Sequence, residues 1–121
     1  EKATSYFADA RLNRQVSRDE ALNLLESAAQ SEDASQETID SAMNSISAMA
    51  SYSMQETQLE NLLIAKDFAD CVVYMTDDAI TVAVPAPAEG LSDASVARIT
   101  DMVTNETDYT AAQLNVIEIS Y

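Results

Sequence analysis

The sequence predicts a single α+β domain, in which a long N-terminal helix precedes an α-β-β-α-β unit with two helices on one face of a three-stranded sheet. Three observations lead to this fold class. The chain has 121 residues, a length that suits one domain. Its one glycine and two prolines all lie within residues 85–90, so few residues elsewhere interrupt a helix. Apolar residues recur at helical spacing in the first half and alternate along later segments, as they do in strands.

Two long helices are expected before the sheet. An apolar stripe at helical spacing predicts the first over residues 4 to about 31. The second covers about 36–66 and starts after Ser35, a residue type that caps helix N-termini. We therefore predict two parts. Residues 1–34 form an N-terminal helical extension, and residues 35–121 form the α-β-β-α-β domain.

The sheet is expected from three later segments. Residues 70–75 and 79–84 predict a β-hairpin, because the second of them alternates strongly apolar residues with small or polar ones. A third helix is expected over about 93–107, with Ser92 as its N-cap. Residues 114–120 then predict the last strand.

The expected strand order follows from the connection through the third helix. A right-handed crossover should place the last strand beside the first and antiparallel to it. The first strand would then be central, and Cys71 would be a buried, unreactive thiol in its apolar run 71–75. Segments 79–84 and 114–120 become edge strands with open backbone groups. The segment Pro85-Ala86-Pro87 is expected to end the second strand after residue 84.

The net charge of −15 is unevenly distributed along the chain. The first 18 residues hold four basic and two acidic side chains, whereas the remainder holds two basic and nineteen acidic ones. Such a body repels phosphate backbones, which argues against nucleic-acid binding. The acidity is interpreted as a source of solubility, with attraction of a basic partner as the alternative.

The residue types needed for most catalytic sites are missing from the sequence. There is no histidine, which removes the usual general base and most zinc chemistry. The single cysteine excludes an internal disulfide. No phosphate-binding loop and no cluster of metal-ligand residues at a known spacing is present. We therefore expect no catalytic residue, no cofactor and no metal site.

Six residues are candidates for a partner interface. Arg11, Arg14 and Arg18 follow one another at i, i+3 and i+7, so they share one helix face. That face either pairs with the acidic body or contacts an anionic lipid or an acidic partner. Ile117, Ile119 and Tyr121 lie on one side of the last predicted strand, whose edge is open.

Four segments in this order and at suitable spacing carry a family resemblance that covers nearly the whole chain. They are YFADARLNR (6–14, continuing to residue 25), LENLLIAKDFADCVV (59–73), DAITVAV (78–84) and LSDASVARITDMVT (91–104). Together they resemble the stage III sporulation protein AH family of endospore-forming bacteria. This chain departs from the family at Lys66-Asp67-Phe68, where members usually have Lys-Gly-Phe, and glycine suits a left-handed helix C-cap better than aspartate.

The resemblance implies a function in assembly. Family members have an N-terminal transmembrane helix in the mother-cell membrane, and their soluble domain lies in the space between mother cell and forespore. There it binds the forespore membrane protein stage II sporulation protein Q. The implied fold is similar to the ring-building modules of type III secretion and flagellar basal bodies, and the implied role is structural, in a channel with a homo- or hetero-oligomeric ring.

The alternative is a generic extracytoplasmic module that binds a ligand or a lipid surface. A secluded apolar pocket would favour this alternative, whereas an exposed sheet edge would favour assembly. No stretch of the sequence approaches the roughly 18 apolar residues that a membrane-spanning helix needs, and no signal peptide is visible. The implied membrane anchor is therefore expected outside this chain.

Overall fold

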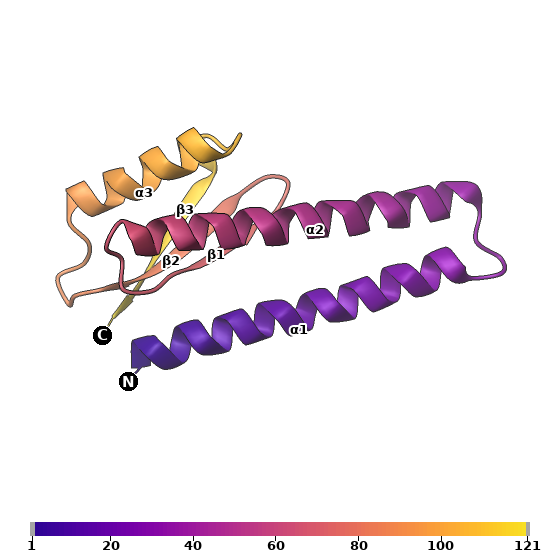
Figure 1. Ribbon diagram of the computed structural model, residues 1–121, viewed down its shortest axis with the longest axis horizontal. Coiled ribbons are helices and arrows are strands. Elements are labelled where there is room, and N and C mark those ends of the chain that lie inside the picture. The colour runs from indigo at the N-terminus through magenta and orange to yellow at the C-terminus, as the bar shows by residue number, and fades with distance from the viewer. Residues whose placement is uncertain (1, 121) are drawn as a thin grey trace.

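The computed structural model describes residues 2–120, and its order of helices and strands agrees with the predicted one (Figure 1). Two long helices come first, a β-hairpin follows, and a third helix leads through a short 3₁₀ turn to the last strand. The elements are α1 (Lys2–Gln30), α2 (Gln36–Ala65), β1 (Val72–Met75), β2 (Ile80–Ala86), α3 (Asp93–Glu106), η1 (Ala111–Gln113) and β3 (Leu114–Ser120).

Both predicted N-caps are confirmed. The backbone N–H of Thr38 donates a 3.1 Å hydrogen bond to the hydroxyl oxygen of Ser35 at the start of α2. The N–H of Ser95 donates to the hydroxyl of Ser92 in the same way at the start of α3, also at 3.1 Å. Each serine thus satisfies one of the N–H groups that a helix leaves without a partner in its first turn.

The end of α2 places an aspartate in a strained backbone conformation. The N–H of Asp67 donates to the carbonyl of Ile64, and the N–H of Phe68 donates to the carbonyl of Leu63, at 3.1 and 3.2 Å. These two bonds define a Schellman motif, which needs a left-handed residue after the helix. Asp67 is that residue, with φ of 77°. The position where the sequence departs from the glycine of the family that it resembles is therefore a position where glycine fits best.

The order of the strands differs from the predicted order. The sheet runs β1-β2-β3, so β2 is central, and β3 pairs with β2 in parallel rather than with β1. The crossover through α3 brings the chain back in the direction of β2, and β3 joins the free side of that strand. The prediction of a central first strand was wrong because the outer side of β1 is occupied by side chains, which are described below.

Pro85 lies within β2 instead of ending it, and the strand continues to Ala86. The antiparallel pairing with β1 ends at the pair Val72–Ala83, whereas the pairing with β3 includes Pro85 opposite Ile119. At Pro85 the central strand therefore needs hydrogen bonds on one side only, which a residue without an N–H group tolerates.

Two apolar clusters lie on opposite faces of the sheet. The larger one joins α2 and α3 to the sheet and includes Leu59, Val82 and Ile99, so the prediction of two helices on one face is confirmed. The smaller one packs Phe7 and Ala10 of α1 on the other face. Its remaining buried members are Val72 and Ala83.

Cys71 precedes the edge strand β1 and is fully buried, as predicted, although it is not at the sheet centre. Burial raises the pKa of its thiol to about 12, and the nearby charges of Glu60 and Asp70 act in the same direction. The thiol is therefore protonated at neutral pH, which is the unreactive form.

The α1–α2 pair forms a helical hairpin that extends well beyond the sheet (Figure 1). The first turns of α1 cover one face of the sheet, and its later turns run only beside α2. The turn at residues 31–35 coincides with the predicted boundary between residues 1–34 and 35–121. The division into an extension and a domain stays a prediction, since α1 also contributes to the core.

Two tyrosines fasten the turn between β1 and β2. The hydroxyl of Tyr52 in α2 donates to the carboxylate of Asp77, and the hydroxyl of Tyr109 donates to the carbonyl of Thr76. The hairpin tip is therefore held from α2 and from the segment before β3. These two hydrogen bonds fix the β1–β2 hairpin relative to α2 and to the segment that follows α3.

The Tyr52–Asp77 bond makes stability depend on alkaline pH. It raises the pKa of Tyr52 from 10.0 to about 12, with partial burial and the charge of Asp77 acting in the same direction. A phenol whose pKa is raised on folding contributes stability that is fully present below about pH 10 and is lost as pH rises through about 12. We expect Tyr52→Phe to remove one late step from the tyrosine absorbance titration. A variant titration that overlays the parent curve would contradict this assignment.

The strain at Asp67 can be tested by substitution. We expect Asp67→Gly to raise the free energy of unfolding by about 0.5–1 kcal/mol, because glycine adopts positive φ without the steric cost of a Cβ. Asp67→Ala serves as the matched control and should lower stability, because alanine lacks the local hydrogen bonding that helps aspartate at positive φ. Urea denaturation of the three proteins measures the differences. Equal stabilities for glycine and alanine would show that the conformation is not strained.

Candidate protein-binding surfaces

The outer edge of β1 is closed by side chains rather than by another strand. One side of β1 pairs with β2, and on its other side the backbone groups of Cys71, Val73 and Met75 bind side chains. The N–H of Val73 donates to Glu60 Oε2 at 2.8 Å, and the N–H of Met75 donates to Glu56 Oε2 at 2.7 Å. Two carboxylates of α2 therefore take the place of carbonyls of a missing strand.

Arginines of α1 complete the same edge from the other side. Arg14 Nη1 donates to the carbonyl of Val73 at 2.6 Å, and Arg11 Nη1 donates to the carbonyl of Cys71 at 3.1 Å. Four outward backbone groups of this short edge thus have side-chain partners from α1 and α2. We call these four side chains, together with Arg18, which binds Glu56, the edge ladder: Arg11, Arg14, Arg18, Glu56 and Glu60.

The members of the edge ladder also neutralise one another. Arg14 Nη1 lies 2.7 Å from Glu60 Oε2, and Arg18 binds both oxygens of Glu56 at 2.5 and 2.7 Å. The side chains of Glu56 and Glu60 are 1% and 11% exposed. Carboxylates buried to this extent need paired charges and hydrogen bonds, and both are supplied here.

Arg11 belongs to the rim of the edge ladder. Its Nη1 lies 2.8 Å from Asp70 Oδ1, and its side chain is 39% exposed. Partial burial alone would raise the pKa of Asp70, but the hydrogen bonds from Arg11 and from the N–H of Cys71 hold it below its usual value. A hydrogen bond to Glu56 likewise raises the pKa of Arg18. The charged forms of Asp70 and Arg18 are therefore favoured.

The structure brings together only part of the predicted interface. All three arginines face the acidic body, so pairing with that body is the observed arrangement of their stripe. Ile117 and Ile119 lie on β3, at the opposite edge of the sheet from the arginines, and Ile119 packs against the cluster that contains Phe7. Tyr121 lies outside the described residues. Whether any of these residues meets a partner stays a prediction.

Sequence reasoning missed Glu56 and Glu60, although a signal was present. The two glutamates are four residues apart, and each precedes a leucine of the core-facing stripe, Leu59 and Leu63, by three residues. Acidic residues interleaved with a buried stripe share its side of the helix. Three arginines on one face of the neighbouring helix were the matching half of the pattern.

The outer edge of β3 is open in the part of the chain that the structure describes. From Asn115 to Ser120, no helix, loop or side chain within residues 2–120 forms a hydrogen bond to the side of β3 that faces away from β2. Ile117, on the face that α1 covers only in part, is 40% exposed. An unguarded strand edge beside an exposed isoleucine is suited to strand addition.

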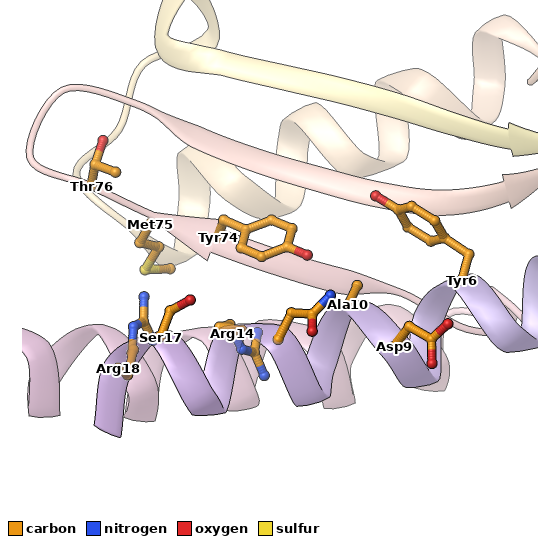
Figure 2. Close-up of a pocket in the computed structure, with 10 residues that line it drawn as sticks. Tyr6, Asp9, Ala10, Arg14, Ser17, Arg18, Tyr74, Met75 and Thr76 are labelled. Carbon is orange, nitrogen blue, oxygen red and sulfur yellow. The ribbon is translucent and has the colours of Figure 1, made fainter. Parts of the chain in front are cut away.

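An open groove of about 530 Å³ lies between α1 and the end of β1 (Figure 2). Tyr6 and Tyr74 approach each other across it, with their hydroxyl ends facing. Asp9 and Arg18 make its helix wall partly charged. The groove is neither secluded nor uniformly apolar, so it lacks the property that would have favoured a ligand-binding module.

Other kinds of site are not indicated within the described residues. No group of three or more cysteine, aspartate or glutamate side chains in residues 2–120 is arranged to hold a metal ion. In the same stretch, no helix combines the length and the apolar character that crossing a membrane requires.

The fold defines the chain as an α+β domain of the ring-building type. It is similar to a chain in the structure of the SpoIIQ–SpoIIIAH pore-forming complex, with a TM-score of 0.77 and 23% identity over 95% of this chain and 96% of that one. It is also similar to EscJ, a type III secretion system protein of enteropathogenic E. coli, with a TM-score of 0.51 and 22% identity over 79% of this chain and 64% of EscJ.

Comparison of the sequence with protein families identifies the family to which the chain belongs. The model of the SpoIIIAH-like protein family matches residues 1–116, and the chain belongs to this family. No curated protein matches the chain in sequence. The resemblance noted from the four segments is thereby confirmed.

The edge ladder should dominate stability. We expect Arg14→Met to lower the free energy of unfolding by about 3 kcal/mol, because it leaves the buried carboxylate of Glu60 without its paired charge and the carbonyl of Val73 without its donor. Arg11→Met should cost about 1 kcal/mol or less, because the Arg11–Asp70 pair is partly exposed. Urea denaturation gives both values. Equal losses for the two variants would show that burial of Glu60 does not set the strength of this contact.

Proposed function

We propose that this chain is a structural component of a sporulation channel that links mother cell and forespore, acting through protein contacts and without catalysis. Membership of the SpoIIIAH-like family over residues 1–116 is the observation that carries the proposal. The likeness to EscJ supports a secretion-like complex, although it concerns the fold alone. The missing histidine and the buried, protonated Cys71 are consistent with a non-enzymatic role.

The proposed partner is the SpoIIQ protein of the same organism. The similar solved chain belongs to a complex of SpoIIQ and SpoIIIAH that is described as pore-forming. By analogy, this chain would lie between the two cell membranes, on the outer side of the mother-cell membrane, with its anchor outside the 121 residues. It would contribute to a ring in which the domain supplies protein contacts.

We assign the partner contact to the open edge of β3. The edge ladder occupies the other edge, so β3 is the side on which a partner strand can add main-chain hydrogen bonds. Ile117 would be covered by such a strand, and Ile119 lies two residues further on the same face. Of the predicted arginines, Arg11 alone keeps substantial exposed surface for a direct contact.

Binding to the SpoIIQ ectodomain tests the proposal. We expect Ile117→Lys to weaken binding about tenfold or more, because lysine guards a strand edge against addition. Leu24→Lys is the matched control, since Leu24 is an exposed apolar residue of α1 and the charge change is the same. Calorimetry measures the affinities, and circular dichroism checks the fold. Ile119→Pro should weaken binding in the same way.

Each outcome separates one part of the proposal from another. Failure of the parent protein to bind SpoIIQ would overturn the choice of partner. Binding that survives both β3 variants with an intact fold would eliminate the β3 edge while leaving the partner in place.

A further inference from the structure

The projecting half of the α1–α2 hairpin lacks a core of its own. Between residues 11 and 55, the one apolar side chain that is buried is Ala42. Larger apolar residues of this half, such as Leu25 of α1 and Ile46 of α2, are only half-buried. Two helices that meet along a single line leave most of their remaining surface uncovered, whereas stable helical bundles add further helices.

One exposed stripe of α2 has the spacing of a helix–helix contact. Asp40, Met43, Ser47, Ala50 and Met54 follow one another at alternating steps of three and four residues, which places them on one side of the helix. All five are exposed. We call this set the methionine stripe.

The two methionines of the stripe are much more exposed than the methionines of the core. Met43 and Met54 are 52% and 66% exposed, while Met75 and Met102 are buried in the core. Exposed methionines are common on surfaces that bind helices, because the side chain adapts to its partner. Ser47 and Ala50 lie between them and are small enough to let a second helix approach closely.

Charge decides what kind of helix fits. Residues 19–55, which include the whole stripe, hold seven acidic side chains and no basic one. The arginines of α1 lie before this segment and are neutralised within the edge ladder. A second copy of the hairpin would bring like charge against like charge, whereas a helix rich in lysine or arginine would complement it.

We propose that the methionine stripe is a docking surface for a basic amphipathic helix of another protein. The distance from Met43 to Met54 is about 16 Å along the helix, which corresponds to about three turns of contact. The docked helix would lie against α2 and supply the layer that the projecting hairpin lacks. This surface does not overlap the β3 edge, so the two contacts are independent.

Methionine methyl NMR gives a direct test. The chain has five methionines, of which Met43 and Met54 report on the stripe, and Met75 and Met102 report on the core. The probe is a synthetic amphipathic peptide with leucine at heptad positions and lysine elsewhere. We expect saturable shifts at Met43 and Met54, little change at Met75 and Met102, and no binding by the same peptide with glutamate in place of lysine.

Matched variants connect the shifts to the stripe. The double substitution Met43→Ser with Met54→Ser should weaken peptide binding about tenfold. The control, Leu12→Ser with Leu24→Ser, removes two exposed apolar residues of α1 and leaves the charge unchanged, so it should change the affinity less than about twofold. Equal weakening by the two double variants would overturn the proposal.

Two further results would also overturn it. Shifts at Met43 and Met54 that depend on protein concentration without peptide would show that a second copy covers the stripe. Binding of the acidic peptide with equal affinity would show that charge does not select the occupant. Because SpoIIQ is absent from this experiment, its outcome is separate from that of the β3 test.

Discussion

Hydrogen bonding along the outer edge of β1 is the constraint on which the rest of the structure depends. The strand is short, and its outward N–H groups are satisfied by Glu56 and Glu60 of α2. Burying two carboxylates is costly without opposite charge nearby. Arg14 and Arg18 of α1 supply that charge, so the position of α1 is set by the needs of a strand more than 50 residues away in the sequence.

The position of α1 in turn shapes the whole molecule. Its first turns close the second face of the sheet through Phe7 and Ala10. Its direction beside α2 leaves the joined ends of both helices projecting beyond the sheet (Figure 1). The apolar cluster under α1 is small, so the ion pairs of the edge ladder carry much of the attachment.

Local patterns were sufficient to predict the helices and strands, because each depends on residues close in sequence. Ser35 and Ser92 cap helices through the next turn, and the alternation along Ile80–Val84 is a property of that segment alone. The strand order was not predictable in this way. It depends on which edge of the hairpin is free, and that edge was decided by glutamates and arginines on two other helices. The sequence showed the arginine stripe, but it did not reveal that the stripe pairs with the buried carboxylates of Glu56 and Glu60.

The acidity of the chain affects both proposed binding surfaces, the β3 edge and the methionine stripe. Arg11, Arg14 and Arg18 of α1 are paired with carboxylates of the fold, so the surface of the molecule is more acidic than the basic N-terminal segment of the sequence suggests. A partner that approaches either surface meets negative charge, which favours unlike chains over like ones.

The closed edge also limits how far a sheet built on this domain can grow. Chains that polymerise by strand pairing need two complementary edges, so that each added copy presents a new one. Here an added strand at β3 meets a sheet whose far side ends in arginine and glutamate side chains. Growth stops after one addition. The closed edge of β1 thereby protects the domain from assembling into fibres when its local concentration is high.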